Sequence, residues 1–253
     1  MTEPRAKSTL HVRLTQWAAH TPRGALDYAG TQARRWIHGA RYREGEAFDY
    51  ARLRWYHEET ATYRTVARGV LPIGLRPLAD VSVTGLDNLP CMGAVILAAN
   101  HYDNLDAYLL MHLVPRPVHF AARPDGFGTG SLCAIWRRLG AFPADAWGIR
   151  YGLKLLAEDG VVGVFPQGTI STDLVTRCGA AGMLALFSGA QVVPVAIQGT
   201  DEIHLSSIFT GRVNVRVRFG RPVRFARSGT NPPRSRAVSD DILGLIRALL
   251  IDT

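Results

Sequence analysis

The chain has 253 residues, 47% of them hydrophobic and 20% charged, enough to bury the core of one α/β domain with an appendage. Cys91, Cys133 and Cys178 lie far apart without a Cys-x-x-Cys pair, which argues against a disulfide framework and a zinc site and favours a reducing, cytoplasmic location. The formal net charge is +8 with a pI near 9.9, but no helix-turn-helix, zinc-finger or RNA-binding signature accompanies the arginines, so we expect no nucleic-acid partner. The first residues lack the apolar core of a signal peptide.

Residues 1–79 read as an N-terminal helical region. Apolar residues recur at helical spacing in stretches near 10–17, 26–37 and 48–70, with arginines between them. This composition suits either a segment that contacts an anionic membrane surface or a helical cap folded onto the rest of the protein. The apolar stretch from residue 66 to 78 is short and contains Arg68 and Arg76, so we predict no transmembrane span and at most peripheral attachment to the inner face of a membrane.

Residues 80–253 alternate between apolar strand patterns and helical patterns. Such alternation predicts an α/β domain with a mixed, largely parallel sheet layered by helices. We expect residues 227–236, which include Pro232 and Pro233, to form a linker before a last helix capped by Ser239. The predicted strands lie near 81–85, 94–99, 117–121, 161–165, 192–198 and 213–219, and the predicted helices near 104–114, 130–139, 148–159, 177–189 and 239–251.

The most chemically informative segment follows the second predicted strand. His101 and Asp106 are five residues apart there, a spacing that would separate their side chains on one continuous helix. The two groups meet only if His101 lies in the loop and Asp106 in the first helical turn, with Asp103 or Asn104 as cap. A histidine held by a carboxylate is suited to act as a general base. Taken alone, a loop histidine and a first-turn acid are equally well explained without catalysis.

Two further predicted strands end in polar loops that can converge on the same edge of the sheet. One runs into Phe165-Pro166-Gln167-Gly168-Thr169, and the other, Val192 to Ile197, runs into Gly199-Thr200. Ligands in open α/β sheets bind at such strand ends. Three loops at one edge therefore favour a binding or catalytic site there.

These blocks resemble, in kind and in order, the motifs of the glycerolipid acyltransferases typified by lysophosphatidic acid acyltransferase. The resemblance covers roughly residues 80–225. The matching residues are Asn100, His101 and Asp106 of an Asn-His-x4-Asp block, Phe165, Pro166, Gly168 and Thr169 of a Phe-Pro-Glu-Gly-Thr block, Val193-Pro194-Val195, and a basic-x-Gly-Ala-Ala run at 177–181.

The chain departs from the family pattern at three positions. It has Gln167 where the family usually has glutamate, and Ile170 and Ala146 where the family has arginines associated with the acceptor phosphate. A guanidinium suits a phosphate far better than these two side chains do. We therefore expect weak dependence on an acceptor phosphate, unless Arg150 or Arg177 takes over this role.

The resemblance implies a fatty acyl transfer from an acyl thioester to a hydroxyl, without a cofactor or metal. His101 would be the general base and Asp106 would orient its ring. The donor would be acyl-CoA or an acyl carrier protein, and the acceptor a lysophospholipid, another glycerolipid or a non-phosphorylated metabolite. The implied substrate-binding residues are Asn100, Asn104, Arg150, Gln167, Gly168, Thr169 and Arg177.

Two points stay open from the sequence. Backbone N–H groups around Gly168 and Thr169, or those at the start of the helix near 104, are candidates for stabilising the oxyanion. Gln167, which carries no charge, would position an acceptor hydroxyl or simply lie in a solvated loop. The alternative to an enzyme is a catalytically silent lipid- or acyl-binding protein with the same fold.

Overall fold

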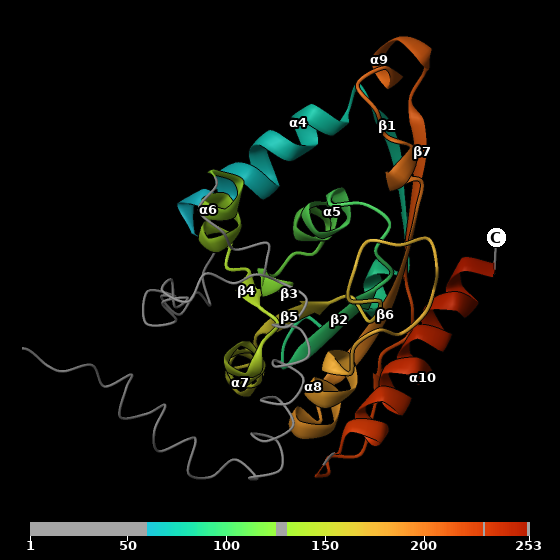
Figure 1. Ribbon diagram of the computed structural model, residues 1–253. Coiled ribbons are helices and arrows are strands. Elements are labelled where there is room, and N and C mark those ends of the chain that lie inside the picture. Colours follow the sequence, from blue (N-terminus) through green and yellow to red (C-terminus); the bar gives the residue numbers. More distant parts are fainter. Residues whose placement is uncertain (1–59, 125–130, 230, 252–253) are drawn as a thin grey trace, which may run out of the picture.

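The computed structural model describes residues 60–124, 131–229 and 231–251 (Figure 1). The helices predicted before residue 60 lie outside this part of the chain. The described strands form one sheet in the order β1-β7-β6-β2-β5-β3-β4, with β8 paired to β6. The strands are β1 (Ala79–Thr84), β2 (Val95–Ala99), β3 (Val118–Ala122), β4 (Phe142–Pro143), β5 (Val161–Val164), β6 (Gln191–Gln198), β7 (Val213–Phe219) and β8 (Val223–Arg224).

The sheet is mixed and mostly parallel, as the alternating sequence pattern predicts. β2 pairs in parallel with both β5 and β6, β3 pairs in parallel with β5 and β4, and β1 pairs in parallel with β7. Only the pairings of β6 with β7 and with β8 are antiparallel among the described strands. The predicted α/β fold class is confirmed.

Helices cover both faces of the sheet (Figure 1). One face carries α5 (Leu105–Leu113), α6 (Ser131–Arg138) and a helical segment made of α3 (Ala61–Tyr63), the π-helix η1 (Arg64–Val70) and α4 (Leu71–Leu75). The other face carries α7 (Ala146–Ala157), α8 (Ala180–Ser188) and α10 (Pro232–Ile251). Shorter elements are η2 (Leu86–Asn88), η4 (Thr200–Glu202) and α9 (Ser207–Thr210).

The central strand β2 joins the two hydrophobic cores that these helices make. Because side chains alternate along a strand, Val95 and Leu97 enter the core under α5, and Ile96 enters the core under α7, α8 and α10. All five β2 residues are fully buried. Burying one such side chain contributes about 1.5–3 kcal/mol, so this strand is a rigid support for the loop that follows it.

The helical segment at 61–75 is fastened to α5. The Tyr63 hydroxyl donates to the Met111 carbonyl and accepts from the Val118 N–H at 3.0 Å. The Arg68 guanidinium donates to the carbonyls of His112 and Val114, which end α5. This described part of the predicted N-terminal region thus packs directly on the helix that carries Asp106. No helix in the described part of the chain is both long and apolar enough to cross a membrane.

The predicted linker at 227–236 is wrong in its second half, where α10 already begins at Pro232. Proline lacks an N–H, but the first turn of a helix needs none, so two prolines are tolerated there. Asn231 caps the turn, since its Oδ1 accepts from the Arg234 N–H at 3.0 Å. Ser239 is not a cap: its hydroxyl is buried and accepts a hydrogen bond from the Gly182 N–H.

Candidate active site

His101 and Asp106 meet at the end of β2, as their spacing predicts. His101 lies in the loop and Asp106 in the first turn of α5, and the His101 Nδ1 is 3.0 Å from the Asp106 Oδ2. The loop is shaped by Asp103, whose carboxylate accepts from the Leu105 N–H at 2.8 Å. An ionised carboxylate only accepts hydrogen bonds, so a neutral imidazole in this position carries its proton on Nδ1 and presents Nε2 as a base.

The Asp106 carboxylate is fully buried and saturated with donors. Its Oδ2 also accepts from the backbone N–H groups of Tyr102 at 2.7 Å and Asp103 at 2.9 Å. Its Oδ1 accepts from the Thr200 hydroxyl at 2.6 Å. The buried charge is therefore held in a fixed orientation toward the imidazole, the arrangement that a base-orienting acid requires.

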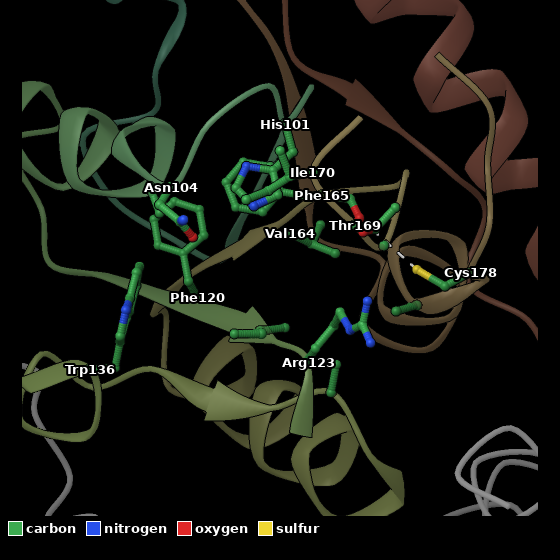
Figure 2. Close-up of a pocket in the computed structure, with 16 residues that line it drawn as sticks. His101, Asn104, Phe120, Arg123, Trp136, Val164, Phe165, Thr169, Ile170 and Cys178 are labelled. Atoms are coloured by element: carbon green, nitrogen blue, oxygen red, sulfur yellow. Dashed lines mark hydrogen bonds between the residues drawn. The ribbon is translucent and has the colours of Figure 1, made fainter. Parts of the chain in front are cut away.

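Phe165 completes the support of the imidazole. Its ring stacks on the His101 ring with centroids 3.9 Å apart and planes 8° apart, and Phe120 stacks behind it at 5.2 Å. Asp106 thus fixes one edge of the imidazole, and Phe165 covers one face. The imidazole ring, whose Nε2 is not used by Asp106, lines a cavity (Figure 2).

The cavity has a volume of about 310 Å³ and lies at the carboxyl ends of β3, β5 and β2. Among the described residues that line the cavity, Arg123 carries the positive charge. Figure 2 shows this side chain across the cavity from His101. The rest of the lining is mainly apolar. It consists of His101, Asn104, Ala107, Phe120, Ala121, Ala122, Arg123, Trp136, Ala144, Val164, Phe165, Gly168, Thr169, Ile170, Cys178 and Ala180.

Three predicted binding residues, Asn104, Gly168 and Thr169, line this cavity with His101. Gly168 adopts the left-handed conformation at φ 68°, which favours glycine, and its N–H donates to the Phe165 carbonyl at 2.9 Å. The Gly168 N–H is therefore already used. The Thr169 N–H and hydroxyl make no hydrogen bond within the described residues, so these two donors are available to a ligand.

Asn100 and Gln167 have structural positions instead of the predicted binding positions. Asn100 is fully buried, and its amide both donates to the Ile197 carbonyl and accepts from the Ile197 N–H, each at 2.8 Å. It thereby continues the β2–β6 pairing beyond Ala99. Its side chain does not line the cavity, and both its polar atoms are used by β6.

Gln167 connects the two motif loops. Its Oε1 accepts from the His101 N–H at 2.6 Å, and its Nε2 donates to the carbonyls of Ser171 at 2.5 Å and Asp173 at 3.0 Å. The Ser171 N–H in turn donates to the His101 carbonyl at 2.9 Å. Gln167 is fully buried, so the expected solvated or acceptor-binding amide is corrected to one that holds the His101 backbone.

Arg150 and Arg177 lie outside the cavity lining. Arg177 is half exposed and pairs with Asp173 at 3.6 Å, while Arg150 stacks on Trp147 with its Cζ 4.6 Å from the ring centroid. Neither takes the place of the absent arginines inside the cavity. No sequence motif indicates a role for Arg123, because a lone arginine after a strand forms part of no recognised motif.

Thr200 and Phe165 were also given no role from the sequence, although both lie in the loops that were expected to converge. The sequence feature that indicates Thr200 is its position directly after the strand predicted at 192–198.

Among the described residues, no group of three or more His, Cys, Asp or Glu side chains is placed to hold a metal ion.

Comparison with known proteins finds similarity to acyltransferases. Residues 80–198 match the model of the acyltransferase family. The chain is 30% identical over 125 residues to a 1-acyl-sn-glycerol-3-phosphate acyltransferase of Bacillus subtilis, covering 47% of this chain and 63% of the relative. It is 32% identical over 141 residues to a 1-acyl-sn-glycerol-3-phosphate acyltransferase of Chlamydomonas reinhardtii, covering 50% of this chain and 41% of the relative. The chain thus matches less than two thirds of the length of either relative.

The fold has a solved counterpart as well. The 1-acyl-sn-glycerophosphate (LPA) acyltransferase of Thermotoga maritima superimposes with a TM-score of 0.52 at 24% identity, over 69% of this chain and 74% of that one. This likeness concerns the fold. The family match spans β1 to β6 and includes both motif loops around His101. Residues 80–198 of this chain are therefore similar to the acyltransferase family.

Proposed function

We propose that this protein transfers a fatty acyl group from an acyl thioester to a hydroxyl of a glycerolipid. The observation that carries the proposal is the His101–Asp106 pair at 3.0 Å, with the imidazole lining a mostly apolar cavity. The match to the acyltransferase family model supports acyl transfer, and the names of the matched relatives support a glycerol phosphate lipid as acceptor. A catalytically silent binding protein would not require a histidine whose ring is fixed by Asp106 at one edge and by Phe165 on one face.

The chemistry follows from the orientation of the ring. His101 Nε2 takes the proton of the acceptor hydroxyl as its oxygen attacks the thioester carbonyl carbon. The resulting imidazolium faces the buried Asp106 carboxylate, which stabilises its charge. When the carbon–sulfur bond breaks, the same nitrogen returns the proton to the leaving thiolate. The protein itself forms no covalent acyl intermediate in this scheme.

Negative charge develops on the carbonyl oxygen during the attack, so a hydrogen-bond donor must face it. We assign this role to Thr169, whose N–H and hydroxyl make no hydrogen bond within the described residues. Thr169 lines the same cavity as His101. The loop that carries it is fixed by Gln167, so these donors are held in place before the reaction begins.

The presence of Arg123 in the cavity favours an acceptor that carries a negative charge. This arginine lines the cavity although Ile170 and Ala146 replace the two arginines that the family uses for phosphate. A guanidinium can bind a phosphate with two parallel hydrogen bonds. We therefore revise the expectation of weak phosphate dependence and propose that Arg123 recognises the phosphate of a lysophosphatidic acid.

The test is product formation from an acyl thioester with lysophosphatidic acid or with monoacylglycerol, which lacks the phosphate. Wild type should form the diacyl product and prefer the phosphorylated acceptor. Arg123→Ala should lose that preference, and Arg123→Lys should recover part of it. Formation of no diacyl lipid by wild type with either acceptor would contradict the proposed reaction, and an unchanged preference in Arg123→Ala would contradict the role of this residue.

A further inference from the structure

The outer side of α7 carries an aromatic residue and a cation next to each other. Trp147 is 60% exposed, although tryptophan is among the largest apolar side chains, and Arg150 follows three residues later on the same side of the helix. The Arg150 guanidinium carbon lies 4.6 Å from the centroid of the indole. The pair thus offers a flat π surface and a positive charge at one place.

Arg150 has no anion to balance it within the part of the chain that the structure describes. It forms no ion pair or hydrogen bond there, and its Nε is buried without a hydrogen-bond partner. Burial lowers the pKa of Arg150 from its usual value. A partly desolvated cation of this kind costs free energy, and a bound anion would offset that cost.

The pair follows a residue of the cavity wall closely along the chain. Ala144 lines the cavity, and its N–H donates to the Ala122 carbonyl at 2.7 Å, which places it beside the strand end that carries Arg123. Asp145 then caps α7, and Trp147 lies in its first turn. A ligand that leaves the cavity past Ala144 would therefore meet Trp147 and Arg150 next.

We propose that Trp147 and Arg150 form a subsite for the nucleotide of coenzyme A, so that the acyl donor is acyl-CoA. This inference depends on the proposed acyl transfer. Acyl-CoA joins its thioester through a pantetheine arm to a diphosphate and an adenosine 3′-phosphate. With the thioester near His101 and the arm leaving past Ala144, the adenine can stack on the indole and Arg150 can bind a phosphate.

Other molecules that could use this subsite would give different experimental results. An acyl carrier protein presents the pantetheine arm without adenine, so a stacking surface would be of no use to it. The phosphate of the lipid acceptor could instead bind Arg150, but it would not require Trp147. The pattern of effects on donor and acceptor therefore identifies the ligand.

The experiment compares steady-state transfer from acyl-CoA with transfer from the matching S-acyl pantetheine, which lacks the nucleotide. In Trp147→Ala, the KM for acyl-CoA should rise about 5- to 150-fold, because stacking on an aromatic ring is worth about 1–3 kcal/mol per base. In Arg150→Ala, it should rise about 10-fold or more, because a hydrogen bond between charged groups is lost. The KM for S-acyl pantetheine, the KM for lysophosphatidic acid and kcat should stay unchanged. Phe209→Ala on α9 and Arg216→Ala on β7 remove an exposed aromatic ring and an exposed arginine at the other end of the molecule and serve as matched controls (Figure 1).

A second measurement does not depend on turnover. Adenosine 3′,5′-bisphosphate, a fragment of coenzyme A, should bind to wild type in a calorimetric titration and bind at least fivefold more weakly to the two α7 variants. Equal KM increases for both donors, an increase for the acceptor alone, or equal binding of the fragment to wild type and variants would overturn the subsite. Fragment binding that depends on Trp147, without any diacyl product, would refute the proposed reaction while leaving the subsite intact.

Discussion

The ring of Phe165 lies face to face with the ring of His101, with 3.9 Å between centroids. Phe165 belongs to the Phe-Pro-Gln-Gly-Thr loop and His101 to the loop after β2, so the two motifs share a direct contact at the catalytic group. The hydrogen bond to Asp106 alone would allow the imidazole to rotate about the Nδ1–Oδ2 direction. The stacked ring removes that freedom.

Replacing Phe165 with leucine keeps an apolar side chain but removes the stacking surface. We expect kcat to fall about 2- to 12-fold, since stacked aromatic pairs contribute about 0.5–1.5 kcal/mol beyond their burial. The control is Phe120→Leu, which also changes a buried stacked ring but leaves the His101 contact in place. An equal loss of kcat in both variants would show that the effect is one of core packing.

Thr200→Val removes the hydroxyl that donates to the Asp106 Oδ1 at 2.6 Å. Both side chains are buried, so the orphaned carboxylate oxygen should cost about 1–3 kcal/mol of unfolding free energy. We expect kcat to fall about 10-fold through poorer orientation of Asp106, with KM unchanged. Thr200→Ser restores the hydroxyl and should restore kcat; a Thr200→Val enzyme with normal kcat would exclude Thr200 from the orientation of the base.

Gln167→Glu introduces the residue that the family usually carries, yet we expect it to be harmful in this chain. Glutamate as an anion cannot donate to the Ser171 and Asp173 carbonyls, and its charge would face both oxygens in a fully buried position. Unfolding free energy in urea should fall by about 2–4 kcal/mol, more than in the uncharged Gln167→Met. If Gln167→Glu were as stable as wild type, the donor role of this amide would be wrong.

The cysteines should differ in their reactivity toward iodoacetamide. Burial raises the pKa of Cys178, which lines the cavity wall, so its thiol stays protonated near neutral pH. Cys91 is exposed. Peptide mapping after alkylation near pH 8 should find Cys91 modified long before Cys178, and the opposite order would mean that the cavity wall is open to solvent.

The sequence predicted those features that depend on local pattern. A buried strand, a helix start at Asp103 or Asn104 and a five-residue spacing were sufficient to bring His101 and Asp106 together, because all three lie within one stretch of chain. The alternation of strands and helices predicted the fold class for the same reason. α10 begins earlier than predicted, since Pro232 and Pro233 are compatible with both a linker and a first helical turn.

Contacts between distant segments were not predictable from local pattern. Asn100 and Ile197 are 97 residues apart, so nothing near Asn100 indicates that its amide would pair with β6 instead of a substrate. Gln167 reads as a polar loop residue until the fold buries it beneath His101. Arg123 becomes a candidate phosphate-binding residue only when the ends of β3 and β5 form one cavity.

The central claim is that the His101 imidazole accepts the proton from the attacking hydroxyl. Its most direct test is the single-turnover rate of acyl transfer by His101→Gln, with circular dichroism and thermal unfolding to show that the fold is kept. We predict a rate at least about 100-fold below wild type, as general-base catalysis usually contributes this much or more. A folded His101→Gln protein that transfers the acyl group at the wild-type rate would contradict the account.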